Sequence, residues 1–477
     1  MRIYFGQTHR ATVLLVLSIL GTTILFGFLT SQFEPFRLLV AVAALAIFTI
    51  AFVKSEIALY ILIFSMLLSP EIMVGGMEGG TAASRGVTLR FDDFLLAIIG
   101  FGWFARTAIY KNLGLFLRTP LNRPIFYYLL ACVVATGFGI MGERVNVKTG
   151  FFFVLKYFEY FIVYFMVINH IENKEQVKKY IFCILVTCFI ISLYGMLQIP
   201  AGGRLTAPFE GVRGEPNSLG GYLIFIGAVA AGMFSRAETL KAKVILGALI
   251  MVILLPYVYT ESRSSYVAFV PTYIALASMC KRRRLMIGLL VIGLLLSPLL
   301  LPSNVIDRIL YTFTQPEQRG QIVIGDTRID TSASARLKSW KEGLEDLPNH
   351  PILGYGVTGY AFMDAQFPRV LVETGILGFL AFGYLLYSIF RLSLLMVRKT
   401  EDPYFKGIAV GFLAGYVGLV FHAIGANTFI IVRIMEPFWF VLAIVVMLPT
   451  LEQGNEQGAQ RREPLGSQVK QPNQKNE

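Results

Sequence analysis

The chain has 477 residues, of which 55% are hydrophobic and only 15% are charged, and its formal net charge is +12 at pH 7. Soluble domains carry about 25% charged residues, so this composition excludes an ordinary soluble enzyme and predicts a polytopic membrane protein. The excess of Lys and Arg does not predict nucleic-acid binding, because no basic run is interleaved with aromatic residues and because cytoplasmic loops of membrane proteins attract the same two residues.

Long apolar runs recur along most of the chain. A membrane-spanning helix needs about 17 to 25 predominantly apolar residues, and such runs predict an all-α, polytopic transmembrane helix bundle of about twelve to fourteen spans. In chain order, the runs lie near residues 12–30, 37–53, 56–70, 90–109, 124–141, 152–170, 178–199, 217–234, 242–259, 264–280, 285–301, 371–390, 405–424 and 429–449.

These spans and the polar segments between them divide the chain into four parts. We expect the first eleven spans in 1–301, one large polar loop with short helices in 302–370, the last three spans in 371–451 and a disordered tail in 452–477. The tail has too few large apolar residues to fold. Within the loop, Leu337, Trp340, Leu344 and Leu347 recur at helical spacing, which predicts an amphipathic helix on the membrane surface.

Basic residues set the predicted orientation. Clusters at 174–179, 236–243, 281–284 and 398–399 fall on one side when fourteen helices alternate, and that side is expected to face the cytoplasm, together with both termini. The large loop then faces outward. Outward segments contain far more Arg than Lys, and because the guanidinium fork matches phosphate and carboxylate groups, we infer anion recognition on that side. The alternative is pairing with acidic residues on the same face.

Catalytic signatures that can be recognised by spacing are absent from the sequence. It contains no phosphate-binding Gly-rich loop with Lys, no G-x-S-x-G, no H-E-x-x-H and no C-x-x-C. The four cysteines lie in or beside apolar runs and have no metal-ligand spacing. We therefore expect no metal site and no cofactor, and we place the chemistry in the outward loops, which are dense in Gly, Pro, Arg and carboxylates.

Three outward segments carry the most distinctive motifs. The first runs from Arg204 to Asn217, the second from Thr260 to Ser265, and the third from Ala335 through Asn349-His350-Pro351-Ile352-Leu353-Gly354-Tyr355-Gly356 to Gly378. In this order they resemble the O-antigen ligase and O-antigen polymerase superfamily, a group of polytopic membrane glycosyltransferases with one large periplasmic loop near the C-terminus. The resemblance covers about residues 200–380, whereas the N-terminal half is similar only as a series of hydrophobic spans.

The resemblance implies transfer of a glycan from an undecaprenyl diphosphate carrier to an acceptor sugar, at the periplasmic face of a bacterial inner membrane and without metal or nucleotide. In-line attack by the acceptor hydroxyl would invert the anomeric carbon. The acceptor is either a second lipid-linked repeat, as in a polymerase, or lipid A-core, as in a ligase. Membrane lipids and a chain-length regulator complete the implied partners. A lipid-linked sugar flippase is the alternative from another class, but such transporters typically contain repeat symmetry, which we do not find.

Arginines are the candidates for holding the diphosphate. Negative charge develops on the leaving phosphate, and a preorganised guanidinium stabilises it. Arg263 is the foremost catalytic candidate because it lies at a helix end near the membrane surface. Asn217 either caps a helix or binds sugar. The other arginines expected to bind substrate are Arg204, Arg213, Arg336 and Arg369. For each arginine, the alternative is an ion pair with a nearby carboxylate.

The general base is where the chain departs from the ligases. In ligases a His stands eleven residues before the Gly that corresponds to Gly375, and here that position is Asp364. A carboxylate can act as a general base, so Asp364 is the first candidate and favours a polymerase; a structural loop role is the alternative. Glu261 and His350 are further catalytic candidates, although His350 also suits a turn before Gly354. Weaker base candidates are Glu210, Glu215 and Glu373.

Two spans contain oppositely charged residues three apart, Lys156 with Glu159 and Arg433 with Glu436. Ionisable groups within spans are functional candidates by default, but residues at this spacing share a helix face and can neutralise each other. We expect intrahelical ion pairs at both places. For the second pair, an equal alternative is that it lines a groove for the lipid carrier.

Overall fold

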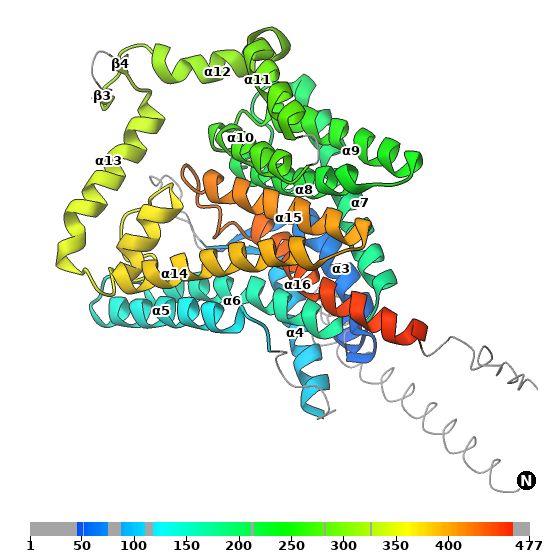
Figure 1. The fold of residues 1–477 in the computed structure, drawn as a ribbon. Helices are drawn as coiled ribbons and strands as arrows, with labels where there is room; N and C mark the ends of the chain where they lie inside the picture. Colours follow the sequence, from blue (N-terminus) through cyan, green and yellow to red (C-terminus); the bar gives the residue numbers. More distant parts are fainter. Residues whose placement is uncertain are drawn as a thin grey trace, which may run out of the picture. The chain divides into compact units, whose positions relative to one another are not determined.

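The computed structural model describes residues 45–50, 52–74, 87–109, 118–210, 214–280, 283–324 and 327–460. The chain forms two compact units, Met1–Ala58 with Ala97–Leu113 and Leu59–Leu96 with Gly114–Glu477. The site described below lies entirely in the second unit. Regular structure in the described residues is almost wholly helical (Figure 1), as the sequence predicts.

In chain order, the helices are α3 (Ser55–Leu68), α4 (Phe91–Ile109), α5 (Asn122–Met141), α6 (Val147–His170), α7 (Lys174–Gln198), α8 (Pro216–Arg236), α9 (Leu240–Tyr259), α10 (Arg263–Ser278), α11 (Arg283–Leu300), α12 (Ser303–Thr314), α13 (Thr331–Asp346), α14 (Gln366–Lys399), α15 (Pro403–His422) and α16 (Val432–Gln460). Two short antiparallel ribbons accompany them. They pair β1 (Glu71–Val74) with β2 (Val87–Arg90) and β3 (Val323–Ile324) with β4 (Thr327–Arg328).

Every predicted span that lies within the described residues coincides with a helix. Eight of these helices, α5 to α9 and α14 to α16, are long and apolar enough to cross a membrane. Six predicted spans are not among the eight. Helices α3 and α10 have only 14 and 16 residues, the sequence of α4 contains three charged residues, and α11 has 18 residues that begin with two arginines. The first predicted span and most of the second lie outside the described residues. Helix α16 continues through Gln460, into the segment predicted to be a disordered tail.

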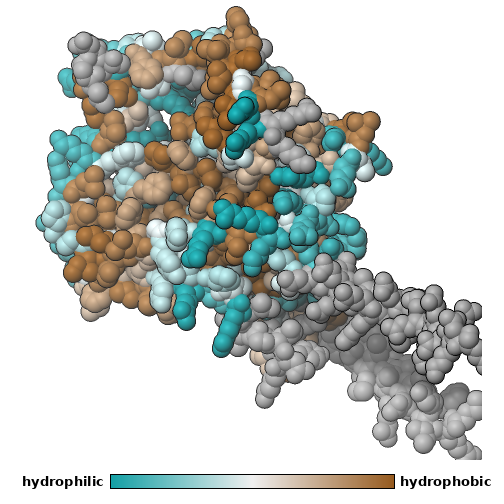
Figure 2. Space-filling view, viewed as in Figure 1, coloured by the Kyte–Doolittle hydropathy of each residue, from teal (hydrophilic) through white to brown (hydrophobic). Residues whose placement is uncertain are grey.

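Apolar side chains cover much of the surface in the view of Figure 2, including α11 near the top. On this helix Leu289, Ile292 and Leu295 are all more than half exposed. Exposed residues of this kind are expected where a helix faces lipid tails instead of water. The large polar loop contains the expected short helices, α12 and α13, and the ribbon β3–β4.

Helices α8 and α15 pack with their backbones in close approach, because glycines lie on the facing surfaces. A Cβ atom on Gly411 would lie 2.5 Å from the Cα of Val229, and one on Gly232 would lie 2.3 Å from the backbone N of Gly411. Small residues spaced by four allow such contacts between membrane helices, and Gly407 and Gly415 extend the row on α15. The packing fixes the start of α8 beside the end of α15.

Helix α14 is broken at Gly375, which has φ 66° and ψ −171°. The loop that follows His350 fills the break: Tyr355 N–H donates to the Val372 carbonyl at 3.0 Å, and Ile376 N–H donates to the Pro351 carbonyl at 2.9 Å. Two parts of the third sequence motif are therefore joined by backbone hydrogen bonds. The helix also starts at residue 366, earlier than the predicted span at 371.

Buried charges within the bundle pair across segments. Lys156 Nζ lies 3.1 Å from Asp93 Oδ2, and Arg433 Nε lies 3.5 Å from Glu210 Oε1. Arg433 also donates to the backbone carbonyl of Pro208 at 2.8 Å. The expectation that Lys156 and Arg433 would be neutralised within their own helices is therefore wrong, because each cation binds an acid that another segment brings to it.

Candidate functional site

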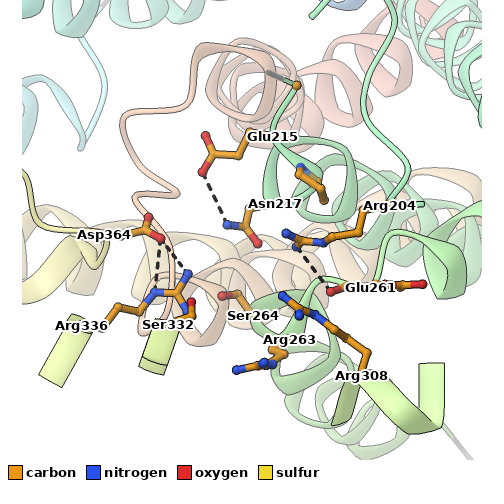
Figure 3. Close-up of a pocket in the computed structure, with 12 residues that line it drawn as sticks. Arg204, Glu215, Asn217, Glu261, Arg263, Ser264, Arg308, Ser332, Arg336 and Asp364 are labelled. Carbon is orange, nitrogen blue, oxygen red and sulfur yellow. Dashed lines mark hydrogen bonds and ion pairs between the residues drawn. The ribbon is translucent and has the colours of Figure 1, made fainter. Parts of the chain in front are cut away.

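A polar pocket of about 220 Å³ lies where the three sequence motifs meet. Its walls come from the segment before and at the start of α8, the turn between α9 and α10, helices α12 and α13, and the loop before α14. The lining residues are Arg204, Gly214, Glu215, Pro216, Asn217, Glu261, Arg263, Ser264, Arg308, Ser332, Arg336 and Asp364. Figure 3 shows Arg204 and Arg308 on one side and the pair of Arg336 and Asp364 on the other.

Arg263 is fixed by a buried carboxylate. Its Nη1 and Nη2 atoms donate to Asp330 Oδ1 and Oδ2 at 2.9 and 2.8 Å, and Asp330 is only 2% exposed. Burial raises the pKa of the Asp330 carboxyl, but the hydrogen bonds and the positive charge of Arg263 outweigh that effect, so the pKa lies below its usual value. The pair holds the Arg263 guanidinium in one orientation at the pocket wall.

Arg336 and Asp364 form a second pair on the opposite wall. Arg336 Nε and Nη2 both donate to Asp364 Oδ2, at 3.2 and 2.7 Å. The other oxygen, Oδ1, accepts no hydrogen bond from the described residues. Asp364 lines the pocket, and one of its carboxylate oxygens has no hydrogen bond in the described part of the chain, while the other oxygen is held by Arg336.

Arg204 and Arg308 have no acidic partner within salt-bridge distance in the described parts of the chain. Arg204 Nη2 reaches only the backbone carbonyl of Glu261, at 3.4 Å. Burial lowers the pKa of the Arg204 guanidinium, and the positive charge of Arg308 lowers it further. Arginine stays charged at any physiological pH, so these two neighbouring cations repel each other. A bound anion would relieve that repulsion.

Three helices direct the first turn of their N-terminal ends to the pocket. Asn217 lies at the start of α8, Ser264 at the start of α10 and Ser332 at the start of α13. A helix N-terminus carries a partial positive charge from its unpaired N–H groups, which favours anions. The helix N-termini and the guanidinium groups therefore both favour binding of an anion in the pocket.

Glu261 lies in the turn between α9 and α10 with a left-handed backbone, φ 49°. A residue other than glycine in this conformation costs on the order of 1 kcal/mol and is common at functional sites. The next residue, Ser262, caps α10 by accepting a hydrogen bond from Ser265 N–H at 3.3 Å. This tight turn brings Glu261 and Arg263 to the same pocket wall. The Glu261 carboxylate has no ion pair among the described residues.

Six of the nine site residues predicted from sequence line the pocket: Asp364, Arg263, Glu261, Arg204, Asn217 and Arg336. Arg213 lies outside the described residues. For Asn217 the capping interpretation is wrong, because Glu215 occupies the N-cap position of α8 and the Asn217 side-chain carbonyl accepts a hydrogen bond from Ser262 Oγ at 2.6 Å.

Two predicted residues, Arg369 and His350, do not line the pocket. Arg369 is 5% exposed, donates to Glu373 Oε1 at 3.0 Å and lies over the ring of Phe153, because α14 begins early enough to bury it. His350 packs edge-on against Tyr355, with ring centroids 4.7 Å apart, and its carbonyl accepts from Gly354 N–H. His350 therefore shapes the turn, which is the alternative role that its place before Gly354 suggests.

Arg308, Ser264 and Ser332 were not among the predicted site residues. Ser264 lies within a recognised motif and Arg308 lies in the large polar loop, but only the position of α12 at the pocket shows that Arg308 belongs to the site. Glu215, a weaker candidate base, also lines the pocket. No group of three or more His, Cys, Asp or Glu side chains in the described residues has the geometry of a metal site.

The fold and the site together define a multi-pass membrane protein with an arginine-rich polar pocket at one end of its helix bundle. Residues 246–383 match the family model described as O-antigen ligase, so this segment is an O-antigen ligase family domain, and the resemblance drawn from the motifs is confirmed over this range. The matched segment contains Arg263, Arg308, Arg336 and Asp364, whereas Arg204 precedes it. No curated protein matches the chain.

Proposed function

We propose that the protein is a membrane glycosyltransferase that moves a glycan from an undecaprenyl diphosphate carrier to an acceptor sugar, and that the polar pocket is its active site. The observation that carries this proposal is the convergence of four guanidinium groups and three helix N-termini on one pocket that also contains carboxylates. Cations favour binding of the diphosphate, and a carboxylate can take the proton that the acceptor hydroxyl must lose.

The donor half of the pocket is formed by Arg204, Arg308 and Arg263. The first two are the cations without acidic partners in the described part of the chain, and they suit a diphosphate that brings its own negative charge. Arg263 is already oriented by Asp330, so it requires little reorganisation as charge develops on the leaving phosphate. Preorganised donors of this kind lower the barrier by several kcal/mol in total.

The acceptor half is formed around Asp364. Its Oδ1 atom has no hydrogen-bond partner among the described residues, while Arg336 holds Oδ2. In the proposed step, Oδ1 takes the proton of the acceptor hydroxyl, the hydroxyl oxygen forms the new bond to the anomeric carbon, and the bond to the diphosphate oxygen breaks. Attack from the face opposite the leaving group inverts the anomeric carbon.

A second lipid-linked repeat is the proposed acceptor, which makes the protein a polymerase. The support is that no histidine of the described residues lines the pocket and that Asp364 stands where the ligases that the chain resembles have His. Transfer to lipid A-core, the ligase reaction, is the second candidate, and the family description favours it.

We place the pocket on the periplasmic side of the inner membrane. Asn217 lies at one end of α8, and the basic residues Arg236, Lys241 and Lys243 lie at or just beyond its other end. Because Lys and Arg accumulate in cytoplasmic loops, the opposite end of α8 is assigned to the periplasm.

The test is reconstitution of the purified protein in nanodiscs with a lipid-linked repeat from the source organism, alone and together with lipid A-core, with products resolved by gel and mass spectrometry. A ladder of repeats without lipid A-core supports a polymerase. Product that forms only with lipid A-core makes the protein a ligase. No glycosidic product and no release of carrier diphosphate under either condition would overturn glycosyl transfer and leave a flippase.

A further inference from the structure

A chain of buried hydrogen bonds leads from the pocket into the bundle. Ser262 Oγ donates to Asn217 Oδ1 at 2.6 Å, Ser265 Oγ donates to Ser262 Oγ at 2.8 Å, and Ser265 Oγ lies 3.2 Å from His422 Nε2. On the far side of the ring, His422 Nδ1 lies 2.7 Å from Thr428 Oγ1. Ser262, Ser265, His422 and Thr428 are all fully buried.

The direction of every bond in this chain follows from Asn217. Its Nδ2 amide group faces Glu215 Oε1 at 3.5 Å, and the opposite orientation would place the amide carbonyl against a carboxylate. The Asn217 carbonyl therefore accepts from Ser262, Ser262 accepts from Ser265, and Ser265 accepts from His422. This order requires the His422 tautomer with hydrogen on Nε2, and Thr428 then donates to Nδ1.

Two glycines of helix α8 leave room for this hydrogen-bond network. A Cβ atom on Gly220 would lie 2.1 Å from Ser265 Oγ, and a Cβ atom on Gly221 would lie 3.2 Å from His422 Cε1. Side chains larger than glycine at these positions would push the hydroxyl or the imidazole away. From Ser262 to Thr428 the network is thus a buried set of hydrogen bonds with one direction, of the kind that fixes one side-chain conformation.

We infer that His422 is a positioning residue: through Ser265 and Ser262 it orients Asn217 so that the Asn217 amide and the Glu215 carboxylate form a subsite for a sugar hydroxyl. An amide N–H and a carboxylate oxygen side by side offer one donor and one acceptor, and a hydroxyl uses both. A phosphate cannot donate to Glu215 and is repelled by it. The inference rests on the proposed function, because it assigns the glycan of the donor to this corner and the diphosphate to the arginines.

The experiment measures binding of two ligands to the protein in nanodiscs: the lipid-linked repeat and the sugar-free undecaprenyl diphosphate. We expect His422→Leu and Asn217→Ala to weaken binding of the lipid-linked repeat about tenfold, the effect of losing one hydrogen bond, and to leave binding of undecaprenyl diphosphate unchanged. Arg308→Ala should weaken both ligands. Retained binding of undecaprenyl diphosphate also shows that a variant is folded.

Two further variants separate positioning from a general structural role. Gln at position 422 can donate to Ser265, so His422→Gln should recover most of the lost affinity, and Thr428→Val should cause a smaller loss than His422→Leu. Equal losses for both ligands, or no loss for either, overturns the inference. A fall in kcat with unchanged affinity for both ligands also overturns the inference, because it would show that the hydrogen-bond network conducts protons instead of positioning Asn217. If the wild-type protein binds neither ligand, the proposed function fails instead.

Discussion

Asp330 accepts two hydrogen bonds from Arg263, at 2.9 and 2.8 Å, although the two residues are 67 positions apart in the sequence. The same carboxylate caps α13 by accepting from Ala333 N–H at 3.2 Å. One side chain therefore ties the start of α10 to the start of α13. Both helix ends line the pocket, so this contact sets the distance between two of its walls.

Replacing Asp330 should destabilise the protein in two separable steps. Asp330→Asn keeps a capping group but removes the charge that Arg263 binds, and Asp330→Ala removes both. Arg263 is 21% exposed, so solvent screens part of the pair, and we expect a loss of about 2 kcal/mol for Asn and about 1 kcal/mol more for Ala. Thermal unfolding should rank the wild type above Asn and Asn above Ala. Equal melting temperatures for the two variants would show that Asp330 does not stabilise the protein by capping α13.

The same pair predicts a dependence of stability on pH. Because the pKa of Asp330 is lowered in the folded protein, its contribution is fully present above the unfolded value of about 3.9 and is lost as the pH falls through the lower, folded value. The difference in melting temperature between the wild type and Asp330→Asn should therefore be constant from pH 7 to about pH 5 and shrink toward pH 3. If the difference in melting temperature already shrinks between pH 7 and pH 5, Asp330 is not the group responsible.

Arg204 and Arg308 should matter for activity and not for stability. Neither has an acidic partner in the described part of the chain, so Arg204→Ala or Arg308→Ala breaks no ion pair and removes one of two repelling charges. We expect melting temperatures close to that of the wild type and product formation lowered about 100-fold, as for loss of one transition-state donor.

The matched control for these arginines is Arg328→Ala. Arg328 lies in the same large loop as Arg308 but is absent from the pocket, and it pairs with Glu317 at the surface at 2.7 Å. Such pairs contribute about 1 kcal/mol or less, so activity should be unchanged. A large drop in the melting temperature of Arg308→Ala would show that this residue is structural.

The sequence was sufficient to place the spans and to select most of the pocket. Apolar runs are local signals, and each predicted span in the described residues became a helix. The three motifs were separately recognisable, and the guanidinium groups of Arg204, Arg263 and Arg336 indicated an anion site from residue type alone. What could not be predicted was which arginines face each other across the fold. The sequence around Arg369 and Arg308 does not show which of them reaches the site. The early start of α14 buries Arg369, whereas α12 brings Arg308 to the pocket.

The indirect link between Asn217 and His422 could not be predicted from the sequence either. The two residues are joined through serines of α10 and the turn before it, and the hydrogen bonds depend on the close packing of α8 against α15. No local pattern in the sequence predicts such an indirect link between distant helices. The predicted pairing of the intramembrane cations failed for the same reason, since Lys156 finds its acid, Asp93, on another helix.

Asp364 should be required for turnover more than for donor binding. Asp364→Asn preserves the shape of the side chain but cannot take a proton, so we expect kcat to fall about 100-fold or more, while binding of undecaprenyl diphosphate stays within a factor of about two to three. Asp307→Asn is the control, because Asp307 is exposed on α12 and is not part of the pocket. If Asp364→Asn retains full turnover, Glu261 becomes the next residue to test as the base.

Gly375 should be intolerant of any side chain, whereas Gly383 on the same helix should accept one. At Gly375 the backbone has φ 66° and ψ −171°, a region essentially restricted to glycine, and a Cβ atom would lie 2.3 Å from the carbonyl oxygen of Ile352. A Cβ atom on Gly383 would meet no neighbouring heavy atom within 4 Å. Gly375→Ala should therefore lower the free energy of unfolding by at least about 2 kcal/mol, and Gly383→Ala should be neutral or stabilise by up to about 1 kcal/mol.

Thermal unfolding of both variants in the same detergent measures the contrast, and activity adds a second reading. The backbone hydrogen bond from Tyr355 to Val372 depends on the break at Gly375, and the segment after Tyr355 leads to Asp364. A Gly375→Ala protein that still folds should thus lose turnover, because the break also positions the loop that carries the proposed base. Equal melting temperatures and equal activities for the two variants would show that the break can be relaxed without cost.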